Sequence, residues 1–221
     1  TLFNALTKTR KAEAANYPFC TIEPNTGRVA VPDARLETIA GIAKSAKVIN
    51  TQLEFVDIAG LVRGASKGEG LGNQFLANIR ECDAIAHVLR CFESEDITHV
   101  DGSVDPIRDA ETIETELMLA DLESLERRYD QVSKRAKTGD RESKEQAAVM
   151  EPIIAALQDG QPARTVEFAK EQRETVRRLQ LLTDKPIMYI CNVDEESAGT
   201  GNDWSSKVTA WAAEQGAASV T

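Results

Sequence analysis

The side chains best suited to chemistry stand at the ends of segments that resemble β-strands. Residues 51–57 alternate between polar and apolar side chains, which predicts a strand whose last residue is Asp57. Asp57 also opens an Asp-x-x-Gly sequence that ends at Gly60. In nucleoside triphosphatases this aspartate bears on Mg²⁺ through water, and the glycine amide senses the γ-phosphate. Taken alone, the four residues are more typical of an ordinary turn.

A second polar group follows the apolar residues 185–192, which predict a buried strand ending at Asn192. Guanine-specific enzymes carry Asn-Lys-x-Asp at this place, and the aspartate accepts two hydrogen bonds from guanine. This chain has Val193 for the lysine and Glu195 for the aspartate. The longer Glu195 side chain changes reach and angle, which predicts weak guanine selectivity and favours adenine. A polar strand cap before an acidic loop is an equally good interpretation.

Thr21 is the third candidate, and it lies in the irregular segment 16–25 between the first helix and the next strand. A hydroxyl on such a loop can join the Mg²⁺ shell only when the γ-phosphate is present. Without the other motifs, a threonine bonded to its own backbone is the simpler interpretation. His87 stands inside the apolar run 84–91, and we expect it to be structural.

These side chains need a scaffold in which strands alternate with helices. The expected strands are residues 28–31, 51–57, 84–91 and 185–192, and the expected helices in the main body are residues 1–8, 73–81 and 205–215. A further helix near residues 171–181 is expected to return to the main body. This order predicts an α/β fold with a doubly wound, mostly parallel sheet, in which ligands bind beyond the carboxyl ends of the strands. Residues 84–91 are apolar enough for a central, buried strand.

The segment from Pro106 onward has a different pattern of apolar and charged residues. Its apolar residues are spaced 4, 3, 4, 3 and 4 apart, at Met118, Leu122, Leu125, Tyr129, Val132 and Ala136. This spacing is that of a coiled-coil seam. Residues 138–140 interrupt it, and a second helix over 141–157 carries one apolar face, formed by Ala147, Met150, Ile154 and Leu157. We therefore predict a helical hairpin inserted as residues 106–181 into a nucleotide domain of residues 1–105 and 182–221.

Composition limits the possible functions. The chain has 221 residues, of which 42% are hydrophobic and 28% charged, as in ordinary globular domains. No apolar run approaches the roughly 20 residues that cross a membrane. The net charge of −10, with no basic cluster, argues against sequence-specific DNA binding. Four scattered cysteines indicate reduced thiols and a cytoplasmic protein rather than a zinc site.

The order of the motifs is more specific than any one of them. Residues 1–7 (Thr-Leu-Phe-Asn-Ala-Leu-Thr) resemble the continuation of a Gly-Lys-Ser-Thr phosphate loop, with Thr1 as its threonine. Segments 16–25, 55–62 and 68–73 follow, together with Asp-Pro-Ile at 105–107. The whole chain thereby resembles the YchF/Obg-like ATPase family of P-loop proteins.

The resemblance implies a P-loop nucleotide domain with a coiled-coil arm, followed by a TGS domain. It implies ATP preferred over GTP, slow Mg²⁺-dependent hydrolysis, and association with ribosomes. We expect both ends of this chain to be cut, with the phosphate-loop lysine and serine before Thr1 and the TGS domain after Thr221. If the molecule ends where this sequence does, tight nucleotide binding is not expected.

Hydrolysis needs a group that holds the attacking water. Ras-like enzymes use a glutamine directly after Asp-x-x-Gly, but Leu61 has no hydrogen-bonding group. The resemblance points instead to His99, whose imidazole can orient water at neutral pH. The resemblance assigns the remaining positions to the nucleotide, namely Thr1, Thr21, Asp57, Gly60, Asn192, Val193 and Glu195, with Thr21 and Asp57 also at Mg²⁺. Two alternatives stay open: a GTPase of the Obg type, and a nucleotide-independent binding module acting through the arm.

Overall fold

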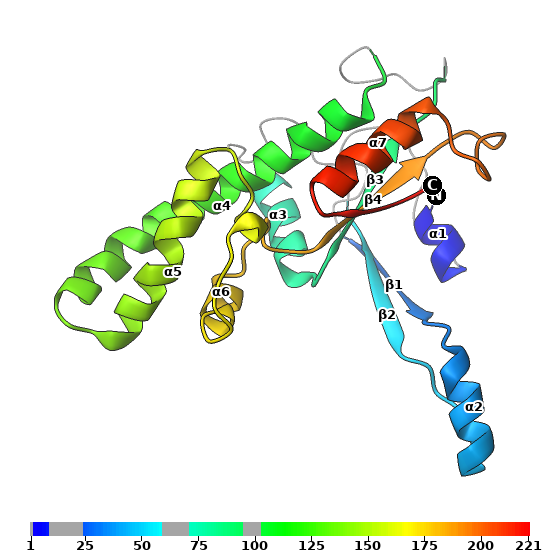
Figure 1. Cartoon of the computed structure of the whole chain (residues 1–221), viewed down its shortest axis with the longest axis horizontal. Coiled ribbons are helices and arrows are strands. Elements are labelled where there is room, and N and C mark those ends of the chain that lie inside the picture. Colours follow the sequence, from blue (N-terminus) through cyan, green and yellow to red (C-terminus); the bar gives the residue numbers. More distant parts are fainter. Residues whose placement is uncertain (1, 9–23, 59–70, 95–102) are drawn as a thin grey trace. The chain divides into compact units, whose positions relative to one another are not determined.

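The computed structural model describes residues 2–8, 24–58, 71–94 and 103–221 (Figure 1). The chain divides into two compact units, Thr1–Gly60 and Leu61–Thr221. Asp57 belongs to the first unit, and the residues around Asn192 belong to the second. None of the helices within these described ranges is both long and apolar enough to cross a membrane.

The first unit is built on an antiparallel strand pair. Strands β1 (Asn25–Ala30) and β2 (Gln52–Asp57) pair over their whole length, with Asn25 opposite Asp57. Helix α1 (Leu2–Thr7) packs on β1 through the buried Phe3. A side chain at Gly27 would place its Cβ only 2.3 Å from Thr7, so this close approach requires glycine.

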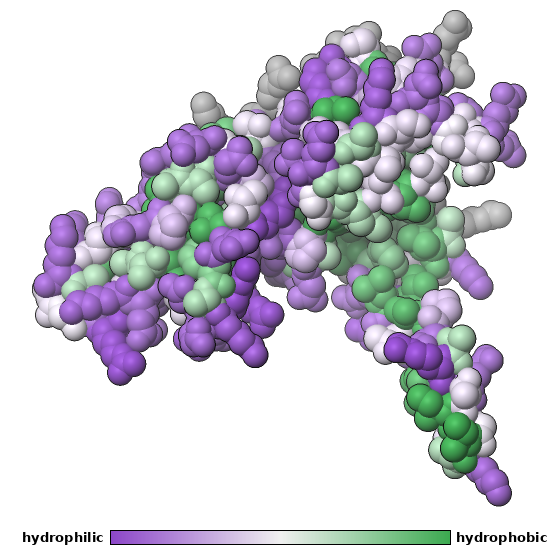
Figure 2. All heavy atoms as spheres, viewed as in Figure 1, coloured by the Kyte–Doolittle hydropathy of each residue, from purple (hydrophilic) through white to green (hydrophobic). Residues whose placement is uncertain are grey.

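Helix α2 (Ala34–Ala43) connects the two strands and was not predicted from the sequence. The Asp33 side chain caps its N-terminus by accepting a hydrogen bond from the Arg35 amide (3.0 Å). Its apolar residues remain exposed, with Ile39 at 59% and Ile42 at 81% (Figure 2). The apolar residues of α2 are only weakly gathered on one side of the helix, so the sequence carries little helical periodicity there, which explains the omission.

The second unit contains a parallel sheet, as predicted for the nucleotide fold. Its strands β3 (Ile85–Arg90), β4 (Ile187–Asn192) and β5 (Ala218–Val220) lie in the order β3-β4-β5. Two helices complete this part, α3 (Leu71–Glu81) and α7 (Asp203–Glu214). The core beside this sheet consists of Leu89, Cys91, Ala110, Tyr189, Cys191, Val208 and Ala212.

Strand β3 differs from the fully buried strand that its apolar sequence predicted. Burial alternates along it, so that Leu89 is 2% exposed whereas Val88 is 47% exposed. In the described sheet β3 stands at one end of the strand order. Its apolar run therefore covers one buried and one open face.

The predicted helical hairpin is present in the second unit. Helix α4 (Pro106–Lys137) packs along α5 (Arg141–Gln158), and both begin with an aspartate cap, Asp105 and Asp140. Leu125 of the predicted seam is fully buried, and Met118, Leu122, Tyr129 and Val132 pack around it. The apolar face of α5 is wider than predicted because Val149 and Ile153 are also fully buried. The treatment of residues 106–181 as a separate domain stays a prediction.

A short return segment follows the hairpin. It contains the 3₁₀ helix η2 (Ala163–Thr165) and helix α6 (Arg173–Leu179), and it leads into β4. Leu179 and Leu181 of this segment complete the hairpin core. The hairpin is thereby closed at its base by chain that comes directly before the Asn192 strand.

Candidate nucleotide site

Asn192 lies where the sequence predicted it, at the carboxyl end of β4. It stands opposite Arg90 of β3, and its backbone oxygen accepts a hydrogen bond from the Cys91 amide (2.7 Å). These bonds fix the backbone, while the Asn192 side chain is exposed. The position is the edge at which parallel sheets bind ligands.

The next residues form a turn with three acidic side chains, those of Asp194, Glu195 and Glu196. The Asp194 carboxylate accepts a hydrogen bond from the Ser197 amide (2.8 Å). The Ser197 side chain and, second, this amide hold the pKa of Asp194 below its usual range. Glu195 is exposed, and in the described part of the chain no hydrogen bond or ion pair engages its side chain. Val193 is half-buried beside the core next to the sheet. Asp194 therefore shapes the turn, whereas the side chains of Glu195 and Glu196 are exposed.

Asn202 anchors the far end of this loop, and sequence reasoning missed it. Its side-chain oxygen accepts from the Ser205 amide (3.0 Å), and the Ser205 hydroxyl accepts from the Asn202 amide (2.8 Å). The Asn202 side chain also donates to the Cys91 carbonyl (2.8 Å). The loop is thus tied to the end of β3 at both sides. The Asn-x-x-Ser spacing of a capping box was the available signal.

Arg90 organises the chain that leaves β3. Its guanidinium donates to the carbonyls of Phe92 (3.0 Å) and Ser94 (3.3 Å) and lies 5.1 Å from the centre of the Phe92 ring. A positive charge over an aromatic face is attractive. Arg90 therefore fixes the last described residues before segment 95–102, which contains the predicted His99.

Asp57 ends β2 in the first unit, as predicted. The side chain is half-buried, and this burial raises the pKa of Asp57. A carboxylate in such a setting gains from a nearby cation, because the cation favours its charged form. Among the described residues there is no group of three or more histidine, cysteine, aspartate or glutamate side chains that could hold a metal ion.

The other four predicted site residues lie outside the described residues, namely Thr1, Thr21, Gly60 and His99. The convergence of Asp57, Asn192 and a phosphate loop on one nucleotide accordingly stays a prediction. His87 has the structural place that we expected. Its ring lies 5.9 Å from that of Tyr189, and burial lowers the pKa of His87 to about 4.

Comparison with known proteins identifies close relatives of this chain. Residues 1–120 match the family described as 50S ribosome-binding GTPase. The chain is 55% identical over 217 residues to the ribosome-binding ATPase YchF of Haemophilus influenzae, covering 98% of this chain and 59% of that protein. It is 50% identical to the Bacillus subtilis protein of the same name over 219 residues, covering 98% of this chain and 60% of the relative.

A solved structure has a similar fold. The structure of the Schizosaccharomyces pombe YchF GTPase superposes with a TM-score of 0.75 at 36% identity, covering 99% of this chain and 60% of that one. The chain spans about three fifths of the length of each of these relatives.

Proposed function

We propose, since the chain belongs to the YchF/Obg-like ATPase family, that it binds ATP and hydrolyses it slowly with Mg²⁺ as a ribosome-associated switch. We place this activity in the cytoplasm, where reduced cysteines and ribosomes occur together. GTP would be the weaker nucleotide.

The turn after β4 is the observation that carries the choice of ATP. Guanine recognition needs a carboxylate that faces two parallel donors of the base. Here Asp194 is engaged by Ser197, and the exposed Glu195 carries one more methylene than the aspartate of guanine-specific sites. A pair of hydrogen bonds loses its value when its geometry no longer matches. Adenine makes no such demand, and its exocyclic amine can donate to Asn192 or Glu195.

Val193 supports the same choice. A lysine at this position would lay its stem over the base, whereas Val193 is half-buried beside the core next to the sheet. It offers only a short apolar surface to a purine. Binding of the purine base would therefore depend on stacking more than on paired hydrogen bonds, and it would discriminate weakly between bases.

Asp57 and Thr21 would hold the metal. A carboxylate and a hydroxyl are the hard oxygen ligands that Mg²⁺ prefers. Bound there, Mg²⁺ would neutralise the charge that develops on the phosphates. The raised pKa of the half-buried Asp57 fits this role, because a cation would compensate for the cost of burying the ionised group.

His99 would orient the attacking water, because Leu61 offers neither a donor nor an acceptor for it. Arg90 would support this role indirectly, by fixing residues 92–94 from which the His99 segment departs. Intrinsic turnover would remain slow until a partner brings His99 to the nucleotide.

Two measurements on the intact protein test the proposal. In competition binding, ATP should displace a fluorescent nucleotide at lower concentration than GTP; a clear preference for GTP would support the Obg-type alternative. In co-sedimentation, a non-hydrolysable ATP analogue should change the fraction bound to ribosomes. Ribosome binding that is the same with and without the nucleotide would instead favour a nucleotide-independent module that acts through the hairpin.

A further inference from the structure

Helix α4 takes part in both apolar cores of the second unit. Its first turns contribute Ile107 and Ala110 to the core beside the sheet, whereas Leu125 lies in the core of the hairpin. Apolar contacts are not directional. Packing alone therefore leaves the angle between hairpin and sheet weakly defined, and a directional contact between the two cores would fix it.

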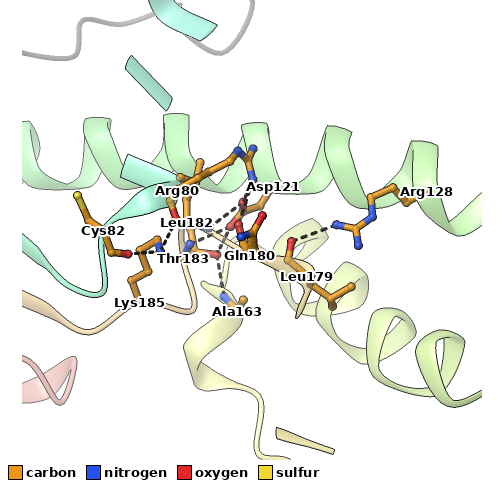
Figure 3. Close-up of polar contacts among 10 residues, drawn as sticks. All are labelled: Arg80, Cys82, Asp121, Arg128, Ala163, Leu179, Gln180, Leu182, Thr183 and Lys185. Carbon is orange, nitrogen blue, oxygen red and sulfur yellow. Dashed lines mark hydrogen bonds and ion pairs between the residues drawn. The ribbon is translucent and has the colours of Figure 1, made fainter. Parts of the chain in front are cut away.

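Asp121 provides such a contact on α4, between these two sets of residues. Its side chain is fully buried, and its carboxylate accepts hydrogen bonds from the amides of Leu182 (3.0 Å) and Thr183 (2.8 Å). It also accepts from the Thr183 hydroxyl (2.8 Å), as Figure 3 shows. These partners lie in the segment between α6 and β4, so Asp121 joins the arm to the chain that enters the sheet.

Thr183 extends the same contact to η2. Its hydroxyl accepts a hydrogen bond from the Ala163 amide (3.1 Å), and its carbonyl accepts from the Arg164 amide (3.1 Å). Arg164 in turn pairs with Glu114 of α4. Both ends of the return segment are therefore tied to the same face of α4.

Helix α3 enters the cluster through Arg80. The guanidinium lies 3.7 Å from the Asp121 carboxylate and donates to the carbonyl of Gln180 (3.2 Å). Lys185 donates to the carbonyls of Arg80 (3.0 Å) and Cys82 (Figure 3). Residues 180–185 thus contact both the Arg80 side chain and the backbone at the end of α3. Asp121 of α4 contacts the same residues through Leu182 and Thr183.

A buried, charged cluster is a costly way to gain stability, because apolar residues of similar volume often stabilise as well or better. The hydrogen bonds of this cluster are directional, so they restrict the relative orientation of the elements that they join. In the chain, α3 begins at Leu71, directly after the glycine-rich residues that follow Asp57. Helix α3 is therefore the first described helix or strand after β2 along the chain.

We propose that the Asp121 junction, formed by Arg80, Asp121, Thr183 and Lys185, makes α3 and the base of the α4–α5 arm one mechanical block. Through it, a nucleotide-dependent shift of α3 turns the arm. The inference rests on the proposed function in one respect only, namely that nucleotide binding causes the shift of α3. The rigid joining of α3 to the arm is independent of it.

The joining is tested first, in the nucleotide-free intact protein, by amide hydrogen exchange. Asp121→Asn replaces one carboxylate oxygen by an amide donor, so one of the two backbone amides, of Leu182 or Thr183, then faces a donor instead of an acceptor. Thr183→Val removes the hydroxyl in a side chain of equal size. We expect exchange in the last turn of α3 to accelerate at least tenfold together with residues 180–185. The control is Ile153→Val, which leaves the junction intact but removes a methylene from the fully buried hairpin core.

Two exchange results would overturn the inference. One is unchanged protection of α3 in both junction variants. The other is an equal loss in Ile153→Val, which would show that α3 responds only to general stability. Because Thr183→Val conserves shape, it keeps the test decisive even if Asp121→Asn does not fold.

The transmission is tested by ribosome affinity with and without a non-hydrolysable ATP analogue. The ratio of the two dissociation constants measures the coupling, which is typically about 5–150-fold in allosteric proteins. In Asp121→Asn and Thr183→Val the ratio should fall at least about fivefold toward one, with ATP affinity unchanged within about twofold. A ratio that persists in both variants contradicts the transmission. A ratio of one already in the unmodified protein contradicts the switch function itself, whereas the exchange experiment still decides whether α3 and the arm are joined.

Discussion

The carboxylate of Asp121 accepts hydrogen bonds from both the amide and the hydroxyl of Thr183, at 2.8 Å each, across 62 residues of sequence. Burial raises the pKa of Asp121, and the hydrogen bonds from Leu182 and Thr183, together with the charge of Arg80, oppose this shift. Both oxygens of the buried carboxylate accept hydrogen bonds, Oδ1 from Leu182 and Oδ2 from Thr183. Its removal would leave two buried amides without an acceptor.

Asp121→Ala should therefore lower the free energy of unfolding by about 3 kcal/mol, since each unsatisfied buried amide costs roughly 1–3 kcal/mol. Denaturant unfolding of the intact protein would measure this. The control is Glu123→Ala on the same helix, where an exposed pair with Arg127 is worth less than about 1 kcal/mol. Equal effects of the two substitutions would contradict the importance of the junction.

His87 should make stability depend on pH. Burial lowers the pKa of His87 from 6.5 to about 4, so the unfolded chain binds the proton more readily than the folded protein. The resulting stability is fully present above pH 6.5 and is lost as the pH falls toward 4. The loss should reach about 3 kcal/mol over this interval.

The variant His87→Gln, which stays neutral, should lose this component of the pH dependence. Denaturant unfolding at pH 7, 6 and 5 would show it as a gap between the two proteins that changes with pH. His99→Gln serves as the comparison, because His87 and His99 are the two histidines of the chain. A constant gap between His87→Gln and the unmodified protein would contradict the burial of a neutral imidazole.

Base selectivity should respond to two residues of the turn after β4. Val193→Lys combined with Glu195→Asp restores the guanine-specific pattern and should shift preference toward GTP by about tenfold or more, since a bidentate pair discriminates by roughly 1–3 kcal/mol. Competition binding with ATP and GTP measures the shift. Glu196→Asp, one residue further along, is the matched control. An unaltered preference in the double variant would mean that other residues read the base.

His99→Ala should depress ATP turnover by about 10²- to 10⁴-fold, the usual contribution of a positioned acid or base. ATP affinity should change little, because the imidazole would act on water and not on the nucleotide. Single-turnover hydrolysis and equilibrium binding separate the two effects. Normal turnover in the variant would eliminate the proposed role.

Some features of this protein can be predicted from patterns among residues that are close in sequence. The seam around Leu125 predicts the hairpin because its spacing is helical, and Asp57 and Asn192 follow recognisable strand patterns. Asp121 gives no such signal, since a single aspartate in a helix is ordinary and its partners lie 61 and 62 residues away. Helix α2 was missed for another reason, because its apolar and polar residues are only weakly separated around the helix.

Asn202 makes two contacts that substitutions can separate. Asn202→Ala removes both the helix cap and the bond to the Cys91 carbonyl, and it should cost about 2 kcal/mol, roughly 1 for each. Asn202→Asp keeps the cap acceptor but cannot donate to Cys91, so it should lose only the second part. Ser206→Ala, at an exposed position of the same helix, should have little effect.

The same variants test whether the loop anchor serves the ligand site. The bond to Cys91 ties the far end of residues 193–201 to β3, so both Asn202→Ala and Asn202→Asp should weaken ATP binding beyond what Ser206→Ala does. Calorimetric titration of the intact proteins with an ATP analogue measures this at a temperature where all remain folded. If Asn202→Ala loses stability but binds ATP normally, the anchor holds helix α7 alone and the loop finds its ligand-binding geometry without it.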